Sequence, residues 1–257
     1  MKKIILTILM ILSLLISCTD SSENKNITIQ QNTSTNHYIN VGIYVYDYPF
    51  GYLSNGNIGG FDYDLMNEIS KISGSNINFI PMRFEELIPA LESKKIDAII
   101  AGMTVTEERK QYLNFSDKYY TSSQAVLIRM NDESIQTEED LIGKKVGVIR
   151  DTVADTMISA KEGIDIERFD TGSSIILSLK VGNVDAAIFD RSTCEHYILY
   201  DKSIKLVENI KYPEEDYAIA FRKDENVLLD EINKALSQIM TNGSYDKLVE
   251  KHLGTNQ

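Results

Sequence analysis

Residues 95–109 read KIDAIIAGMTVTEER, and this stretch decides the fold. The apolar run at its start is typical of a strand that is covered on both faces of a sheet. The small and polar residues AGMT follow, and TEER predicts the start of a helix. Apart from Glu107 and Glu108 on that same helix, no acidic residue near Arg109 in the sequence could neutralise it. A ligand is therefore one candidate for the missing partner.

The strand pattern occurs a second time. LESKKIDAIIAG begins at Leu91 and LKVGNVDAAIFD at Leu179, and each has a leucine, a β-branched residue five positions later, Asp-Ala and an apolar run. VGI at Val41 matches VGV at Val146. Both copies fall at the same point in the order of predicted elements. The sequence therefore predicts an α/β fold of two similar β-α-β-α-β lobes.

Alternation and helical periodicity give the elements of each lobe. In the first lobe we expect strands at 39–46, 77–82 and 96–102, with helices at 60–73 and 84–93. In the second we expect strands at 144–149, 165–170 and 184–190, with helices at 153–161 and 173–182. A helix at 191–200, strands at 204–208 and 217–223, and an amphipathic segment at 227–249 follow. We expect that last segment to return to the first lobe, with a two-strand hinge near residues 122–126 and 214–217.

The amino terminus has the features of an export signal. MKK is followed by an almost entirely apolar stretch at 4–16, which is short for a membrane span. The stretch ends in LISC, which resembles the bacterial lipobox, so Cys18 is the predicted lipidation site; an ordinary signal peptide with an incidental cysteine is the alternative. The predicted organisation is a signal peptide at 1–17, a disordered tether at 18–37, the first lobe at 38–123 and 216–257, and the second lobe at 124–215.

Composition excludes some functions. The 257 residues hold 38 acidic and 26 basic side chains, for a net charge of -12, which disfavours nucleic acid as a partner. The two cysteines are Cys18 and Cys194, so with Cys18 lipidated no disulfide is expected, and Cys194 is expected in the core. Clustered His and Cys ligands and phosphate-binding loops are absent from the sequence. We expect a monomer that binds no metal or cofactor.

The predicted strand ends point to a ligand. In open α/β sheets, ligands bind beyond the carboxyl ends of the strands, so Gly102, Thr104 and Arg109 should face Asp190 across a cleft. A guanidinium binds carboxylates, a lone carboxylate suits an ammonium, and the Thr104 hydroxyl can donate. The implied ligand is an α-amino acid. Arg109 could instead be a solvated helix residue, Asp190 a helix cap and Thr104 a turn residue.

Residues from about 41 to 254 resemble the solute-binding proteins of polar amino-acid ABC transporters, extracytoplasmic solute-binding family 3. The resemblance rests on GFDYDLMNEIS, FEELIPALESKKIDAIIAGMTVTEERKQYLNFSDKYY, EDLIGKKVGV, RFDTGSSIILSLKVGNVDAAIFD, YAIAFRK and NGSYDKLVEKHLG. It implies a two-lobed periplasmic-binding-protein-like fold of type II. It also implies site roles: the ligand carboxylate held by Ala101, Gly102, Thr104 and Arg109, the ammonium by Asp190, further donors at Thr152, and an aromatic contact from Phe84.

Two stretches depart from the family pattern. DTV at 151–153 has Asp151 where the family usually has glycine, which puts the local backbone in doubt. In VGIYVYDYPFGY, Tyr44 stands at the family's aspartate and Asp47 at its stacking aromatic; Tyr46 and Tyr48 are candidate replacements. Asp47 points either to solvent or into the pocket, where it would favour a basic or amide side chain.

The resemblance implies binding without turnover: capture of a polar amino acid between the lobes and delivery to an ABC permease, outside the cytoplasm on a lipid anchor. A cyclohexadienyl dehydratase-like enzyme on the same fold is the alternative. His37, His196 and His252 are poorly placed for catalysis, while Glu107 and Asp47 remain candidate acids or bases. A third possibility is a surface lipoprotein that binds host or wall components, which would not need Arg109 paired with Asp190.

Overall fold

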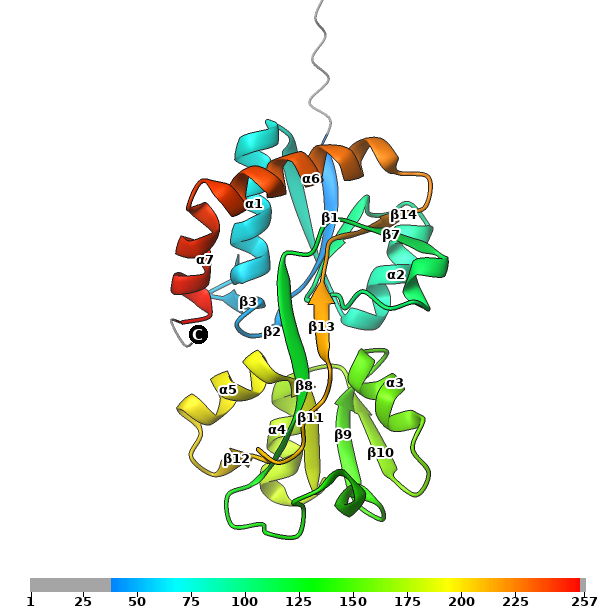
Figure 1. Cartoon of the computed structure of the whole chain (residues 1–257), viewed down its shortest axis with the longest axis vertical. Coiled ribbons are helices and arrows are strands. Elements are labelled where there is room, and N and C mark those ends of the chain that lie inside the picture. The colour runs from blue at the N-terminus through cyan, green and yellow to red at the C-terminus, as the bar shows by residue number, and fades with distance from the viewer. Residues whose placement is uncertain (1–37, 255–257) are drawn as a thin grey trace, which may run out of the picture. The chain divides into compact units, whose positions relative to one another are not determined.

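A computed structural model describes residues 38–254, which form two lobes around two sheets (Figure 1). The first sheet has the order β5-β1-β6-β14-β7 and the second β10-β9-β11-β8-β12. The predicted two-lobed α/β fold is therefore confirmed. The signal peptide, Cys18, the tether and His37 lie outside the described residues.

The first lobe surrounds the first sheet. Its strands are β1 (Tyr38–Tyr44), β5 (Asn76–Met82), β6 (Ala98–Ile100), β7 (Leu113–Phe115) and β14 (Ala220–Arg222). Its helices are α1 (Phe61–Ser73), α2 (Phe84–Glu92), α6 (Asn226–Thr241) and α7 (Ser244–His252). A small sheet of β2 (Tyr46–Asp47), β3 (Gly51–Ser54) and β4 (Asn57–Gly59) precedes α1.

The second lobe surrounds the second sheet. Its strands are β8 (Tyr120–Arg129), β9 (Lys145–Ile149), β10 (Asp165–Phe169), β11 (Ala186–Asp190) and β12 (Ile204–Leu206). Its helices are α3 (Val153–Ser159), α4 (Gly172–Val181) and α5 (Arg191–Tyr200), with a short 3-10 helix, η2 (Glu138–Leu141), before β9.

The internal repeat seen in the sequence is a repeat in strand register. β1 pairs in parallel with β6 so that Val41 faces Ala98, and β9 pairs in parallel with β11 so that Val146 faces Ala186. In each lobe the aspartate of Asp-Ala accepts a hydrogen bond from the backbone of the neighbouring strand. Asp97 Oδ2 lies 3.0 Å from the Asn40 nitrogen and Asp185 Oδ2 2.9 Å from the Lys145 nitrogen.

Small residues in the central strands let helices approach closely. A Cβ on Gly42 would lie 2.9 Å from Leu87 Cδ2 of α2, and one on Gly147 would lie 2.5 Å from Ile175 Cγ2 of α4. Behind the first sheet, Leu65 and other apolar residues of α1 lie in one core cluster with apolar residues of α6.

Two strands connect the lobes. β8 pairs antiparallel with β13 (Glu214–Tyr217) over their shared length, from Tyr120 opposite Tyr217 to Ser123 opposite Glu214 (Figure 1). β8 continues into the second sheet, and after β13 the chain enters β14 of the first sheet. The lobe boundaries given above stay a prediction, while the two-strand connection is part of the fold.

Some element boundaries differ from expectation. The helix predicted at TEER is wrong in type: only a three-residue 3-10 helix, η1 (Arg109–Gln111), forms, because β7 begins at Leu113 and leaves no room for further turns. The strand predicted at 217–223 is divided between β13 and β14. Among residues 38–254, no helix combines the length and apolar character needed to cross a bilayer.

Candidate functional site

A cavity of about 50 Å³ lies between the two lobes, at the carboxyl ends of the central strands. Seven of its sixteen lining residues were not singled out by the sequence. The other nine are all of the predicted ligand contacts: Tyr44, Asp47, Phe84, Ala101, Gly102, Thr104, Arg109, Thr152 and Asp190.

Arg109 is buried, with 7% of its surface exposed. Its Nη1 donates to the Thr104 carbonyl at 2.9 Å, and its Nη2 donates across the lobes to the Asp151 carbonyl at 3.1 Å. The guanidinium carbon lies 5.5 Å from the centre of the Phe84 ring. Within residues 38–254 no carboxylate lies within 4.0 Å of it, and burial lowers the pKa of Arg109. The alternative of a solvated helix residue is therefore wrong.

Asp190 both caps a helix and presents a free oxygen. Its Oδ1 accepts hydrogen bonds from the Ser192 nitrogen at 3.0 Å, at the start of α5, and from the Ser122 hydroxyl at 2.8 Å. Its Oδ2 is buried and has no hydrogen-bond partner among the described residues. Burial, and then the charge of Asp47, raise the pKa of Asp190 well above its usual range. A cation placed beside Oδ2 would relieve this cost.

Thr104 has already used its hydroxyl hydrogen. Its Oγ1 donates to Glu215 Oε2 at 3.0 Å, and an ionised carboxylate can only accept. Gly102 is similarly engaged, because its backbone nitrogen donates to Asp62 Oδ2 at 2.8 Å. In this arrangement Thr104 offers lone pairs, and not a hydrogen, to the cavity.

Asp47 points inward, so its solvent-facing alternative is wrong. Its Oδ1 accepts a hydrogen bond from the Thr193 hydroxyl of the second lobe at 2.7 Å, and burial raises the pKa of Asp47 to about 6. Tyr44 also joins the lobes, since its hydroxyl donates to the Asp170 carbonyl at 3.0 Å. The Tyr44 ring packs edge-on against Phe84, with centroids 5.9 Å apart.

Asp151 stands in a backbone conformation that favours glycine. Its φ is 61°, in the left-handed region, which aspartate tolerates better than most residues. The next residue, Thr152, is the N-cap of α3 and accepts from the Asp155 nitrogen. In this turn the Asp151 carbonyl accepts the hydrogen bond from Arg109.

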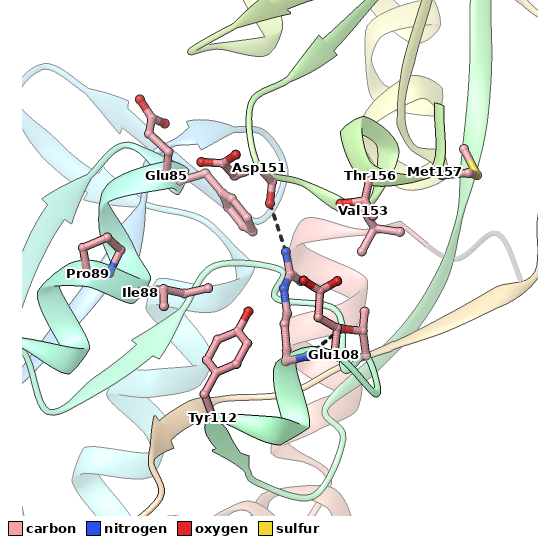
Figure 2. Close-up of a pocket in the computed structure, with 12 residues that line it drawn as sticks. Glu85, Ile88, Pro89, Glu108, Tyr112, Asp151, Val153, Thr156 and Met157 are labelled. Carbon is pink, nitrogen blue, oxygen red and sulfur yellow. Dashed lines mark hydrogen bonds between the residues drawn. The ribbon is translucent and has the colours of Figure 1, made fainter. Parts of the chain in front are cut away.

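A larger hollow of about 460 Å³ adjoins the cavity and shares Phe84, Arg109 and Val153 with it. Figure 2 shows side chains of α2, the η1 region and α3 around this hollow, with a hydrogen bond running to Asp151. The hollow is lined by three acidic residues, Glu85, Glu108 and Asp151, and by apolar ones such as Ile88.

Sequence reasoning missed Gln124 and Tyr217, which come from the connecting strands β8 and β13. Gln124 lies opposite Asp190 in the strand register, a contact between residues distant in sequence. Sequence reasoning also missed Ile149, Val153, Ala154, Ile188 and Phe189, which the rule that ligands bind at strand carboxyl ends could have found.

The remaining reactive side chains lie elsewhere. Cys194 is in the core as predicted, and burial raises the pKa of its thiol. His196 stacks on Tyr48 with ring centroids 3.6 Å apart, and His252 contacts Asp64; neither lines the cavity. Over the part of the chain that the structure describes, no group of His, Cys, Asp and Glu could hold a metal ion.

Comparisons with known proteins agree with this geometry. Residues 39–255 match the model of bacterial extracellular solute-binding proteins, family 3. A probable histidine-binding protein of Campylobacter jejuni is 31% identical over 93% of each chain. The arginine-binding extracellular protein ArtP of Bacillus subtilis is 36% identical over 79% of this chain and 81% of its own. An ancestral arginine-binding protein bound to glutamine has a TM-score of 0.80 at 40% identity, over 84% of this chain and 98% of the other. These relatives are named as binding proteins and not as enzymes.

Proposed function

The chain belongs to the bacterial extracellular solute-binding proteins, family 3, and on that premise we propose that it captures a polar α-amino acid between its lobes and delivers it to an ABC permease. One observation carries the proposal. Among residues 38–254, the buried guanidinium of Arg109 has no carboxylate partner and the buried oxygen Asp190 Oδ2 has no donor, and both line the same cavity from opposite lobes. A zwitterion supplies both missing partners.

We propose a role for each residue from the atoms that it leaves free. Arg109 holds the α-carboxylate, since its fork suits a planar anion. Asp190 Oδ2 accepts from the α-ammonium. We propose that Thr104 Oγ1, whose own hydrogen goes to Glu215, also accepts from the α-ammonium and does not donate to the carboxylate as the resemblance implied. Phe84 and Tyr44 supply the apolar walls along the ligand side chain.

The charges of the cavity favour a basic amino acid. Two partly buried carboxylates, Asp47 and Asp190, line the cavity with one guanidinium, Arg109, so an amino acid with a second cation balances them. Ionised Asp47 would pair with that side chain, which relieves the burial cost that raises its pKa to about 6. The names of the arginine- and histidine-binding relatives support this class of ligand.

We propose further that Cys18 carries the lipid that anchors the protein outside the cytoplasm, after removal of residues 1–17. The lipobox-like LISC and the polar stretch that follows it support this proposal. Membrane fractionation of a Cys18→Ser variant tests it: the variant should appear in the soluble extracytoplasmic fraction. Its full retention in the membrane would overturn the anchor. We propose a monomer, because one chain supplies both halves of the cavity.

Calorimetry with a panel of amino acids tests the function. Arginine, lysine and histidine should bind more tightly than glutamine, and glutamate should bind weakly. Asp190→Asn should weaken arginine more than 5-guanidinopentanoate, the analogue without the α-amine. Failure of the whole panel to bind, or turnover of prephenate or arogenate by the protein, would overturn the proposal.

A further inference from the structure

Glu215 lies behind the cavity wall and holds two side chains that form it. Its Oε2 accepts from the Thr104 hydroxyl at 3.0 Å and from Gln124 Nε2 at 3.1 Å. Thr104 and Gln124 both line the cavity and are each 6% exposed, whereas Glu215 is not among the lining residues. The Glu215 carboxylate therefore orients two polar side chains of the site without lining the cavity itself.

The backbone keeps Thr104 in reach of Glu215. Thr104 forms a β-bridge with Tyr217, the Val105 nitrogen donates to the Asp216 carbonyl at 2.9 Å, and the Ala218 nitrogen donates to Met103 at 3.1 Å. These bonds fasten the loop after β6 to the connecting strand β13. They keep the backbones of Thr104 and Glu215 side by side, so the two side chains stay within reach of each other.

A threonine hydroxyl has one hydrogen and two lone pairs, and an ionised carboxylate has lone pairs only. With its hydrogen directed at Glu215, Thr104 can only accept on its cavity side. Released from Glu215, the hydroxyl could turn its hydrogen toward the cavity and oppose an ammonium there. The identity of residue 215 thus decides which ligand group Thr104 recognises.

We infer that Glu215 is a positioning residue that makes Thr104 an acceptor and thereby selects the ligand α-ammonium. The inference rests on the proposed amino-acid site. Glu215 acts together with Asp190, because Gln124, its second donor, lies opposite Asp190 in the strand register. Two acceptors, Asp190 Oδ2 and Thr104 Oγ1, then serve the same cation.

Calorimetry with L-arginine and 5-guanidinopentanoate tests the inference. Glu215→Leu should weaken arginine by about 10-fold, the value of roughly one hydrogen bond, and change 5-guanidinopentanoate by less than about 3-fold. Glu215→Gln keeps an acceptor oxygen and should stay within about 3-fold of wild type for both. Glu214→Gln, at an exposed neighbour on the same strand, is the matched control.

A Thr104→Val background completes the test. Val has no hydroxyl, so Thr104→Val alone should weaken arginine and spare 5-guanidinopentanoate, and adding Glu215→Leu should change arginine affinity no further. Equal losses for both ligands, equal losses in the Leu and Gln variants, or additive losses with Thr104→Val would each overturn the inference. If Glu215→Leu does not fold, the Thr104→Val and Glu215→Gln results decide. Wild-type protein that binds neither ligand nor any amino acid would instead overturn the proposed function.

Discussion

The two lobes share their framework at one end of the sheets and differ at the other. In the first lobe, Arg222 Nη1 donates to the carbonyls of Leu91 at 3.3 Å and Ile96 at 2.7 Å. In the second, Arg129 Nη1 makes the corresponding bonds to Leu179 at 3.1 Å and Val184 at 2.7 Å. Each arginine also contacts the aspartate of its Asp-Ala strand, Asp97 or Asp185.

At the cavity ends the lobes present opposite charges. The strand of the first lobe leads to Arg109, and that of the second ends in Asp190. The shared arginines and aspartates serve the strands themselves, whereas the charges at the cavity are not required by the strands. The comparison teaches that the repeated part builds the fold and the different part recognises an asymmetric ligand.

Arg109→Ala should have the largest effect. It removes the guanidinium and leaves the bound carboxylate without a charged partner, so arginine binding should weaken by about 2–5 kcal/mol. Calorimetry measures the loss, and urea unfolding without ligand shows whether the fold survives. Unchanged affinity would show that the charge difference between the lobes is not the basis of ligand recognition.

Asp62 gives a second contrast. This carboxylate, in the first turn of α1, accepts a hydrogen bond from the Gly102 nitrogen and has no cationic partner within the described part of the chain. Asp155 of α3 accepts from the Asp151 nitrogen and is paired with Arg168. Burial raises the pKa of Asp62 to about 7, above its unfolded value of 3.8. The folded state therefore holds this proton more tightly, and the associated stability, present below about pH 4, is lost as the pH rises through about 7.

Asp62→Asn should flatten that pH dependence. At about 1.4 kcal/mol per pKa unit, wild type should lose roughly 3–4 kcal/mol from pH 4 to 8 that the variant keeps. Some slope should remain, because burial also raises the pKa values of Asp47 and Asp190. Urea unfolding of both proteins at several pH values measures this slope. Parallel curves for wild type and Asp62→Asn would contradict the prediction.

The matched arginines test the shared framework. Arg222→Met and Arg129→Met should each lower the free energy of unfolding by about 1–3 kcal/mol, because backbone carbonyls lose charged donors. The loss should be larger for Arg222, whose side chain is 13% exposed against 29% for Arg129. Neither change should alter arginine affinity by more than about 2-fold. A binding defect in either variant would show that framework and site are not separate.

The sequence predicted the framework because its signals are local. The Asp-Ala strands and the helical periods need only neighbouring residues, and the rule on strand ends then brought Arg109 and Asp190 to one place. The direction of the Thr104 hydroxyl depends on Glu215, 111 residues away, and the inward turn of Asp47 on Thr193, 146 residues away. Such contacts cannot be read from spacing. The helix expected at TEER failed for a related reason, since β7 pairs with β14 from the far end of the chain.

The smallest expected effect concerns two left-handed residues, one in each cavity loop. Gly102 has φ 54° and Asp151 has φ 61°. Asp151→Gly should change both stability and arginine affinity by less than about 1 kcal/mol, because glycine adopts this conformation freely but gains entropy in the unfolded chain. Asp151→Val should lower stability by about 1–2 kcal/mol, since a β-branched residue is strained there. It should also weaken binding, because the strained turn moves the carbonyl that receives Arg109. Urea unfolding and calorimetry on the two variants measure the difference. A valine variant as stable as the glycine variant would show that the second lobe does not need a left-handed residue at position 151.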